Sequence, residues 1–136
     1  MIASLAGLVV ALAGLYLAAL GVAALLAPAR AGRFLLGFAD SAPKHYLELA
    51  LRLAVGGAML VHAPRSVHPG AFEVAGWGLV GTTAVLSLLP WRWHHRFARA
   101  AVPRAMRRLP LVGLASLLLG ALVLAAVAAG MTAGAP

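Results

Sequence analysis

The stretch LVGLASLLLGALVLAAVAAGM, residues 111–131, carries no charged side chain and is long enough to cross a lipid bilayer. A hydrocarbon core of about 30 Å requires about 20 residues of helix. Backbone N–H and C=O groups must be paired inside such a core, and a helix pairs them within the segment itself. The stretch therefore predicts a transmembrane helix that begins at Pro110 and ends before the small residues TAGAP.

Three further segments are apolar enough to be membrane spans. The expected spans are Ile2–Ala27, Tyr46–Ala63 and Ala71–Leu89. Pro28 and Pro90 follow the first and third, where a proline is expected to end a helix. The first span lacks the basic start of a secretory signal and is longer than the apolar part of one, so we expect a retained helix; cleavage at LAPARA is the alternative.

Composition agrees with a membrane protein. Of 136 residues, 63% are hydrophobic and only 10% are charged, and the mean hydropathy is +0.97. Eleven basic and three acidic residues could not supply the polar surface of a soluble domain of this size. The sequence therefore predicts an all-α polytopic membrane protein, with residues 1–136 forming a single transmembrane domain of four helices.

Basic residues are concentrated in two of the three connections between the spans. The first connection holds Arg30, Arg33 and Lys44, and the short second one holds only Arg65. The third holds Arg92, Arg96, Arg99, Arg104, Arg107 and Arg108. Since cytoplasmic loops are enriched in Lys and Arg, we expect both basic connections to face the cytoplasm and both termini to lie outside it.

The two basic connections also resemble each other. PARAGRF, from Pro28, aligns with PWRWHHRF, from Pro90, with one inserted residue in the second copy. Gly14 matches Gly76, and Gly57 matches Gly120, at nearly the same offset. The pattern predicts two tandem helical hairpins, at about 2–63 and about 71–131. The alternative is that any two Ala- and Leu-rich hairpins with Pro-x-Arg turns align this well.

The third connection, residues 91–109, has the composition of an interfacial segment. Trp91, Trp93 and Phe97 are suited to the headgroup layer, and the arginines beside them predict a short amphipathic helix at the surface. Together with Arg30 and Arg33, these arginines are candidates for contact with anionic lipid headgroups or an acidic partner. The alternative is that they serve topology and anchoring alone.

Glu48 and Arg52 are the charges expected within a span, with Lys44 one turn earlier on the same helix face. A charge deep in a bilayer is costly, so such residues are usually paired and often functional. The sequence leaves two interpretations open, a structural ion pair and a polar site inside the bundle.

Glycines form a regular stripe in the first span and part of one in the fourth. Gly7, Gly14 and Gly21 are seven residues apart, as are Gly113 and Gly120. Small residues on one face let helix backbones approach closely in lipid. The stripe fits either internal packing or a homodimer, and internal packing is the interpretation we favour.

Chemistry-bearing clusters are sparse. The chain has no cysteine, and His62, His68 and Glu73 near the second turn match no standard metal pattern. Bis-histidine haem ligation would need histidines on facing helices, and the first, third and fourth expected spans contain no histidine. Nucleophilic catalysis by a serine would need a base and a carboxylate around it, and the sequence offers no such arrangement. We expect no enzyme activity, no cofactor, no metal and no nucleic-acid partner.

Two motifs resemble a known family. Pro28-Ala29-Arg30 and the run from Glu48 to Gly57, ELALRLAVGG, are similar to the YjeT-like small bacterial inner-membrane proteins. The likeness covers Leu20 to about Ala63 and, more faintly, Leu86 to Val127, where the double glycine is replaced by Leu119-Gly120. The resemblance implies a single-hairpin family of unclear function, here duplicated.

These features predict a non-enzymatic accessory or scaffolding protein. It would bind membrane lipids or a larger membrane protein through its helices and its basic face. The alternative is a small oligomeric transporter or channel in which Glu48 and Arg52 line a polar path.

Overall fold

A computed structural model describes residues 1–38, 41–90, 92–93, 96 and 107–133 of the chain. The described residues are almost entirely helical, with no strand among them. The elements are α1 (Ile2–Leu26), α2 (Pro28–Phe38), α3 (Ala42–His62), η1 (Ala63–Arg65), α4 (Pro69–Leu88) and α6 (Leu109–Ala133).

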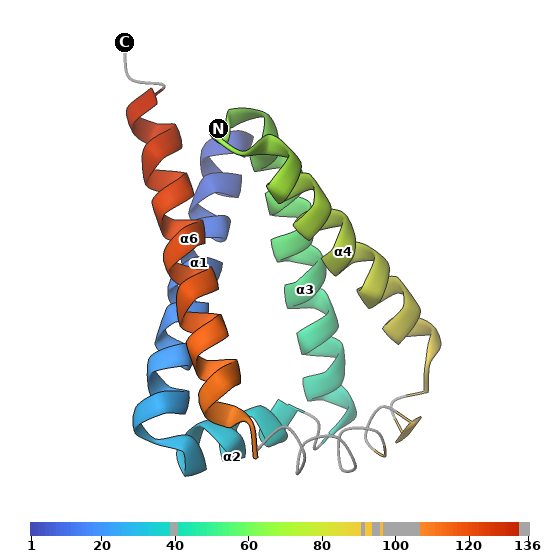
Figure 1. Cartoon of the computed structure of the whole chain (residues 1–136). Helices are drawn as coiled ribbons and strands as arrows, with labels where there is room; N and C mark the ends of the chain where they lie inside the picture. Colours follow the sequence, from blue (N-terminus) through green and yellow to red (C-terminus); the bar gives the residue numbers. More distant parts are fainter. Residues whose placement is uncertain (39–40, 91, 94–95, 97–106, 134–136) are drawn as a thin grey trace.

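Four segments are long and apolar enough to cross a membrane: α1, α3 with η1, α4 and α6. They alternate in direction, so both chain termini lie at the same end of the bundle (Figure 1). We call this the termini end, and we call the opposite end, where α2 and the first residues of α6 lie, the basic end. The prediction of an all-helical protein with four potential spans is confirmed.

The first connection is more helical than we expected. It was predicted as a loop from Pro28 to His45, but α2 occupies Pro28–Phe38 and α3 begins at Ala42. Pro28 fits the first turn of α2, because backbone N–H groups in the first turn of a helix have no intrahelical acceptor and proline lacks this group. On α2, Ala31 is buried while Arg30 and Arg33 are exposed, so this helix is amphipathic.

The spans form two closely packed pairs. The most extensive helix contact joins α1 to α6, and the next joins α3 to α4; a smaller contact between α1 and α3 connects the pairs. Within the second pair, α3 and α4 diverge towards the basic end (Figure 1). This pairing does not by itself confirm the predicted tandem hairpins, in which α1 and α3 form one unit and α4 and α6 the other.

Glycines set the distance between α1 and α6. A Cβ added at Gly21 would lie 2.6 Å from the carbonyl oxygen of Gly113, and one added at Gly120 would lie 2.6 Å from that of Gly14. These helices therefore touch backbone to backbone at two levels, seven residues apart. Four of the five glycines singled out in the sequence lie in this interface inside one chain.

All four spans meet in an apolar cluster towards the termini end. Its buried members are Val10 of α1, Met59 of α3, Ala63 of η1, Phe72 of α4, and Val123 and Val127 of α6. A smaller cluster at the basic end joins Ala24 of α1, Ala31 of α2 and Leu109 of α6. The two helix pairs are thus joined by apolar packing at the termini end, while the cluster at the basic end fixes α2 to the α1–α6 pair.

Replacing Gly120 with alanine is expected to destabilise the bundle by about 1–3 kcal/mol, a typical cost of overpacking. The added Cβ would lie 2.5 Å from the backbone nitrogen of Ala18, and backbone cannot rotate away as a side chain can. The free energy of unfolding in mixed micelles measures the effect.

Gly78→Ala is the matched control, because a Cβ at Gly78 of α4 has nothing within 4 Å. We expect this variant to be neutral or slightly stabilised, since alanine is the better helix former. Equal destabilisation by both substitutions would contradict the close-packing account.

Candidate functional site

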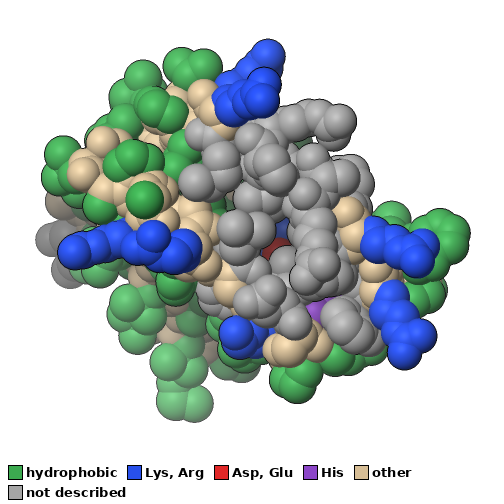
Figure 2. Space-filling view, turned by 90° about the horizontal axis from the view of Figure 1, so that it is seen from below, with side chains coloured by type: hydrophobic (Ala, Val, Ile, Leu, Met, Phe, Trp, Pro, Cys, Tyr) green, Lys and Arg blue, Asp and Glu red, His purple; other side chains and the backbone are tan. Residues whose placement is uncertain are grey.

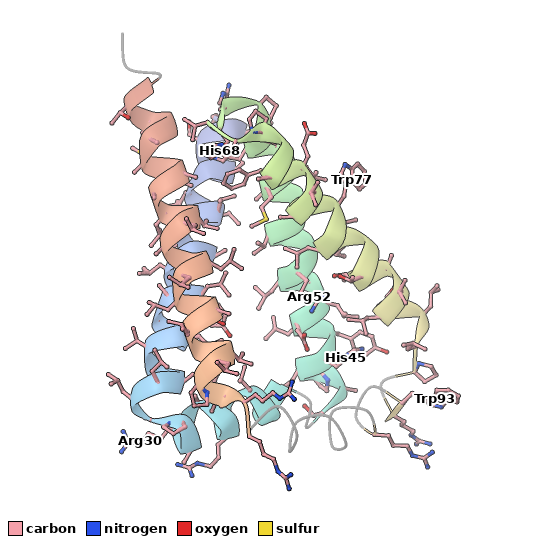
Figure 3. The ribbon with its side chains drawn as sticks, viewed as in Figure 1. Arg30, His45, Arg52, His68, Trp77 and Trp93 are labelled. Carbon is pink, nitrogen blue, oxygen red and sulfur yellow. The ribbon has the colours of Figure 1, made fainter. Side chains whose placement is uncertain are left out.

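Arg52 is a charged residue at the centre of α3. It lies ten residues from each end of the helix as the structure bounds it, Ala42–His62, or about 15 Å along the axis. The sequence had placed it nearer a boundary, because the span was expected to begin at Tyr46. Figure 3 shows Arg52 midway along the helix.

The guanidinium group of Arg52 joins α3 to α4. Its Nε donates to the hydroxyl oxygen of Thr83 at 3.2 Å, and its Nη2 donates to that of Thr82 at 3.0 Å. Its Nη1 lies 3.6 Å from Oε1 of Glu48, one turn earlier on α3. Each of its three nitrogens therefore has a partner within the α3–α4 pair.

The two threonines are arranged to accept these bonds. The Thr83 hydroxyl donates its proton to the carbonyl oxygen of Leu79 at 2.6 Å, and that of Thr82 donates to the carbonyl of Gly78 at 2.6 Å. A hydroxyl has one proton and two acceptor sites, so once the proton is used on the helix backbone the oxygen faces Arg52 as an acceptor. The α4 backbone thus orients both acceptors.

The polar cross-link, as we call Glu48, Arg52, Thr82 and Thr83, is only partly enclosed. The side chains of Glu48 and Arg52 are each 30% exposed, whereas Thr83 is 1% exposed. Tyr16 of α1 lies close enough to feel the charge of Glu48. The ion pair is therefore accessible from outside the α3–α4 contact.

Lys44 lies outside the cross-link. It shares a helix face with Glu48 and Arg52, as expected from the spacing, and it is exposed in the first turn of α3. The ion pair that the structure gives to Glu48 is with Arg52.

The arginines and tryptophans predicted to contact lipid or a partner lie at the basic end where they are described. Figure 2, which views this end, shows Lys and Arg side chains distributed around it. All the described members are exposed: Arg30, Arg33, Arg92, Trp93, Arg96, Arg107 and Arg108. Trp91, Arg99 and Arg104 lie outside the described residues, as does most of the amphipathic helix expected after Pro90.

Gly7 has a different neighbour from the other glycines of its stripe. A Cβ on it would lie 3.4 Å from Nδ1 of His62, so this glycine faces α3 rather than α6. The heptad spacing continues along α1, but the helix that packs against it changes.

The sequence analysis missed Thr82, Thr83 and the glycine contact between α3 and α4. A Cβ at Gly56 would lie 3.1 Å from the carbonyl oxygen of Gly76. A usable signal was present: in an antiparallel pair with a short turn, residues equally far from that turn face each other. Gly56 with Gly76, and Arg52 with Thr83, are nearly equidistant from the turn that follows η1.

Among the described residues, no three His, Asp or Glu side chains gather in a way that could hold a metal ion. No family model, curated protein or solved structure matches this chain.

Thr83→Val is expected to destabilise the bundle by about 0.6–1.7 kcal/mol, the range measured for hydrogen bonds between membrane helices. Valine keeps the shape of threonine but removes the acceptor for Nε of Arg52. Unfolding in mixed micelles measures the change.

Thr132→Val is the control, because the Thr132 hydroxyl bonds only to its own helix, at the carbonyl of Ala129. Its variant should unfold as the parent does. A Thr83→Val protein as stable as the parent would show that the cross-link adds nothing to the packing of α3 on α4.

Proposed function

We propose that this protein is a non-enzymatic integral membrane protein that acts as an accessory or scaffolding subunit, anchored by anionic lipid at its basic end. The observation that carries the proposal is the charge distribution. Outside the cross-link, the described Lys and Arg side chains lie at the basic end, with the exception of Arg65.

Helix α2 supports this reading by presenting two of these cations at a fixed position. Ala31 and Leu35 pack with Ala24 of α1 and Leu109 of α6. Arg30 and Arg33 are exposed on the same short helix, and Arg107 and Arg108 immediately precede Leu109. The same apolar contact therefore brings cations from two segments to one region of the surface.

The energetics favour lipid as the ligand of this surface. Each arginine near an anionic membrane surface contributes on the order of 1 kcal/mol, so the set together contributes several. Trp93, which is exposed at the same end, has the amphipathic ring typical of the headgroup layer. Under this proposal the basic end faces the cytoplasm and both termini face the other side of a bacterial inner membrane.

A duplicated hairpin is part of the proposal and has support from the glycine contacts. A two-fold axis along the membrane normal would relate α1 to α4 and α3 to α6, so it would relate the α1–α6 interface to the α3–α4 interface. Gly14 meets Gly120 in the first interface, and Gly76 meets Gly56 in the second. The repeat aligned Gly14 with Gly76 and Gly120 with Gly57, so the two contacts correspond to within one residue.

The second candidate is a small oligomeric transporter or channel, favoured by the polar cross-link. Charges inside a membrane usually face a bundle interior or a water-filled cavity. Glu48 and Arg52 would line the path.

Lipid retention in native mass spectrometry tests the leading proposal. Replacing Arg30, Arg33, Arg107 and Arg108 together with glutamine is expected to lower retention of anionic phospholipid at least about tenfold, because tenfold needs only about 1.4 kcal/mol. Zwitterionic lipid should be retained as before. Arg65→Gln, at the opposite end, is the matched control and should leave lipid retention unchanged.

The same native mass spectra test the accessory role. A larger membrane protein that co-purifies in fixed ratio would support it. Equal anionic-lipid retention by the parent and the fourfold variant would overturn the anchoring proposal, and a bare homo-oligomer would favour the second candidate.

Cysteine labelling distinguishes the second candidate, because the chain has no cysteine of its own. If a polar path reaches the cross-link, Tyr16→Cys in liposomes should react with a membrane-impermeant maleimide. Trp77→Cys is the control: Trp77 is 64% exposed on α4 and points away from the bundle (Figure 3), so it faces lipid in a monomer. Labelling of neither position would count against a path.

A further inference from the structure

His62 is a buried histidine without a hydrogen-bond partner at the termini end of α3. It is 7% exposed, and neither Nδ1 nor Nε2 has a partner among the described residues. A neutral imidazole carries one N–H donor and one acceptor nitrogen, and leaving buried polar groups unpaired costs stability. An apolar side chain would fill the same place at a lower cost in stability, so packing alone does not explain a histidine at this position.

The ring lies where the two helix pairs meet. Gly7 of α1 faces it, with Nδ1 3.4 Å from the Cβ that an alanine there would have. The ring of Phe72 on α4 lies against it in a T-shaped arrangement, with centroids 5.4 Å apart and ring planes at 76°. The neighbouring residues Met59 and Ala63 belong to the apolar cluster that joins all four spans.

Charged groups on the surrounding elements do not pair with this ring. Helix α6 has no ionisable side chain, and no described carboxylate forms an ion pair with His62. The other ionisable groups on these elements are the Met1 amine and Tyr16 of α1, Lys44, His45, Tyr46, Glu48 and Arg52 of α3, Arg65 of η1, and His68 and Glu73 at the start of α4.

Protonation would change this contact qualitatively. An imidazolium has two N–H donors and a full charge, and at this position it would lie against the Phe72 ring and Gly7, with no carboxylate paired to it among the described residues. A buried charge with no partner is far costlier than a neutral ring. The protonated side chain is more stable in water or in the headgroup layer than between the two helix pairs. Reaching either environment requires α1 to move away from α3 and α4.

We propose that His62 is a proton-sensitive clasp: while it is neutral, α1 stays packed against α3 and α4 at the termini end, and when it is protonated, the buried charge separates them. Histidine is suited to this role because its charge changes between about pH 5 and pH 8. The proposal does not depend on lipid binding at the basic end, and it concerns the compartment that the termini end faces.

Pulsed electron–electron distance measurements in nanodiscs test the clasp. Spin labels on Leu5→Cys of α1 and Val67→Cys beside η1 report the separation of the two pairs, and both positions are exposed. We expect one short distance at about pH 8 and a second, longer population that grows as the pH falls to about 5. A distance distribution that does not change with pH would overturn the proposal.

Two substitutions assign any change to His62. His62→Leu removes the titrating group, and His62→Gln keeps a neutral polar side chain in case the leucine variant does not fold. Either folded variant should keep the short distance at both pH values, whereas His68→Gln, which alters an exposed histidine at the same end, should respond as the parent does. A response that persists in the His62 variants would assign the opening to another group and overturn the clasp.

Discussion

The close approach of helix backbones at glycine is the constraint on which the rest of this bundle depends. Lipid is as apolar as leucine, so burying leucine between helices gains little, and association depends on packing and polar contacts. None of the four glycines in the α1–α6 interface has room for a Cβ: backbone atoms lie nearest at Gly21 and Gly120, and side-chain carbons lie nearest at Gly14 and Gly113. This contact fixes α1 on α6, and α1 then offers Gly7 and Val10 to the α3–α4 pair near the termini end.

Between α3 and α4, one glycine contact is followed by polar contacts towards the basic end. Gly56 and Gly76 bring α3 and α4 together, but towards the basic end Arg52 and Thr83 stand between the helices. In the proposed repeat, Thr83 is the counterpart of Gly21. A guanidinium needs more room than two backbones in contact, so the polar cross-link accounts for the divergence of α3 from α4 and for the partial exposure of its own ion pair.

Much of the architecture was predictable from residues alone, and the errors have physical causes. Span positions follow from apolar length, so Leu111–Met131 was placed within a few residues of α6. The connection after Pro28 was taken for a loop because its charges were read as loop content, whereas on a helix they occupy the exposed face of α2.

Gly14 and Gly120 were identifiable by spacing, but their partners were not, because one-dimensional spacing does not say which helix lies opposite. Thr82 and Thr83 were overlooked because hydroxyls in an apolar helix usually bond to their own backbone. They do so here as well, and the bond to Arg52 uses the acceptor sites that remain.

The pairing of α1 with α6 also constrains the order in which the molecule can be assembled. Helices emerge from the ribosome in sequence, so α1 is in the membrane while α2, α3 and α4 are still being made, and its principal partner arrives last. Helices α3 and α4, joined by a short turn, can pack as soon as both have inserted. Until α6 arrives, the glycine face of α1 is open to lipid or to any other small-residue helix nearby. The newly made chain is therefore most exposed to mispairing in the interval before its last helix is inserted.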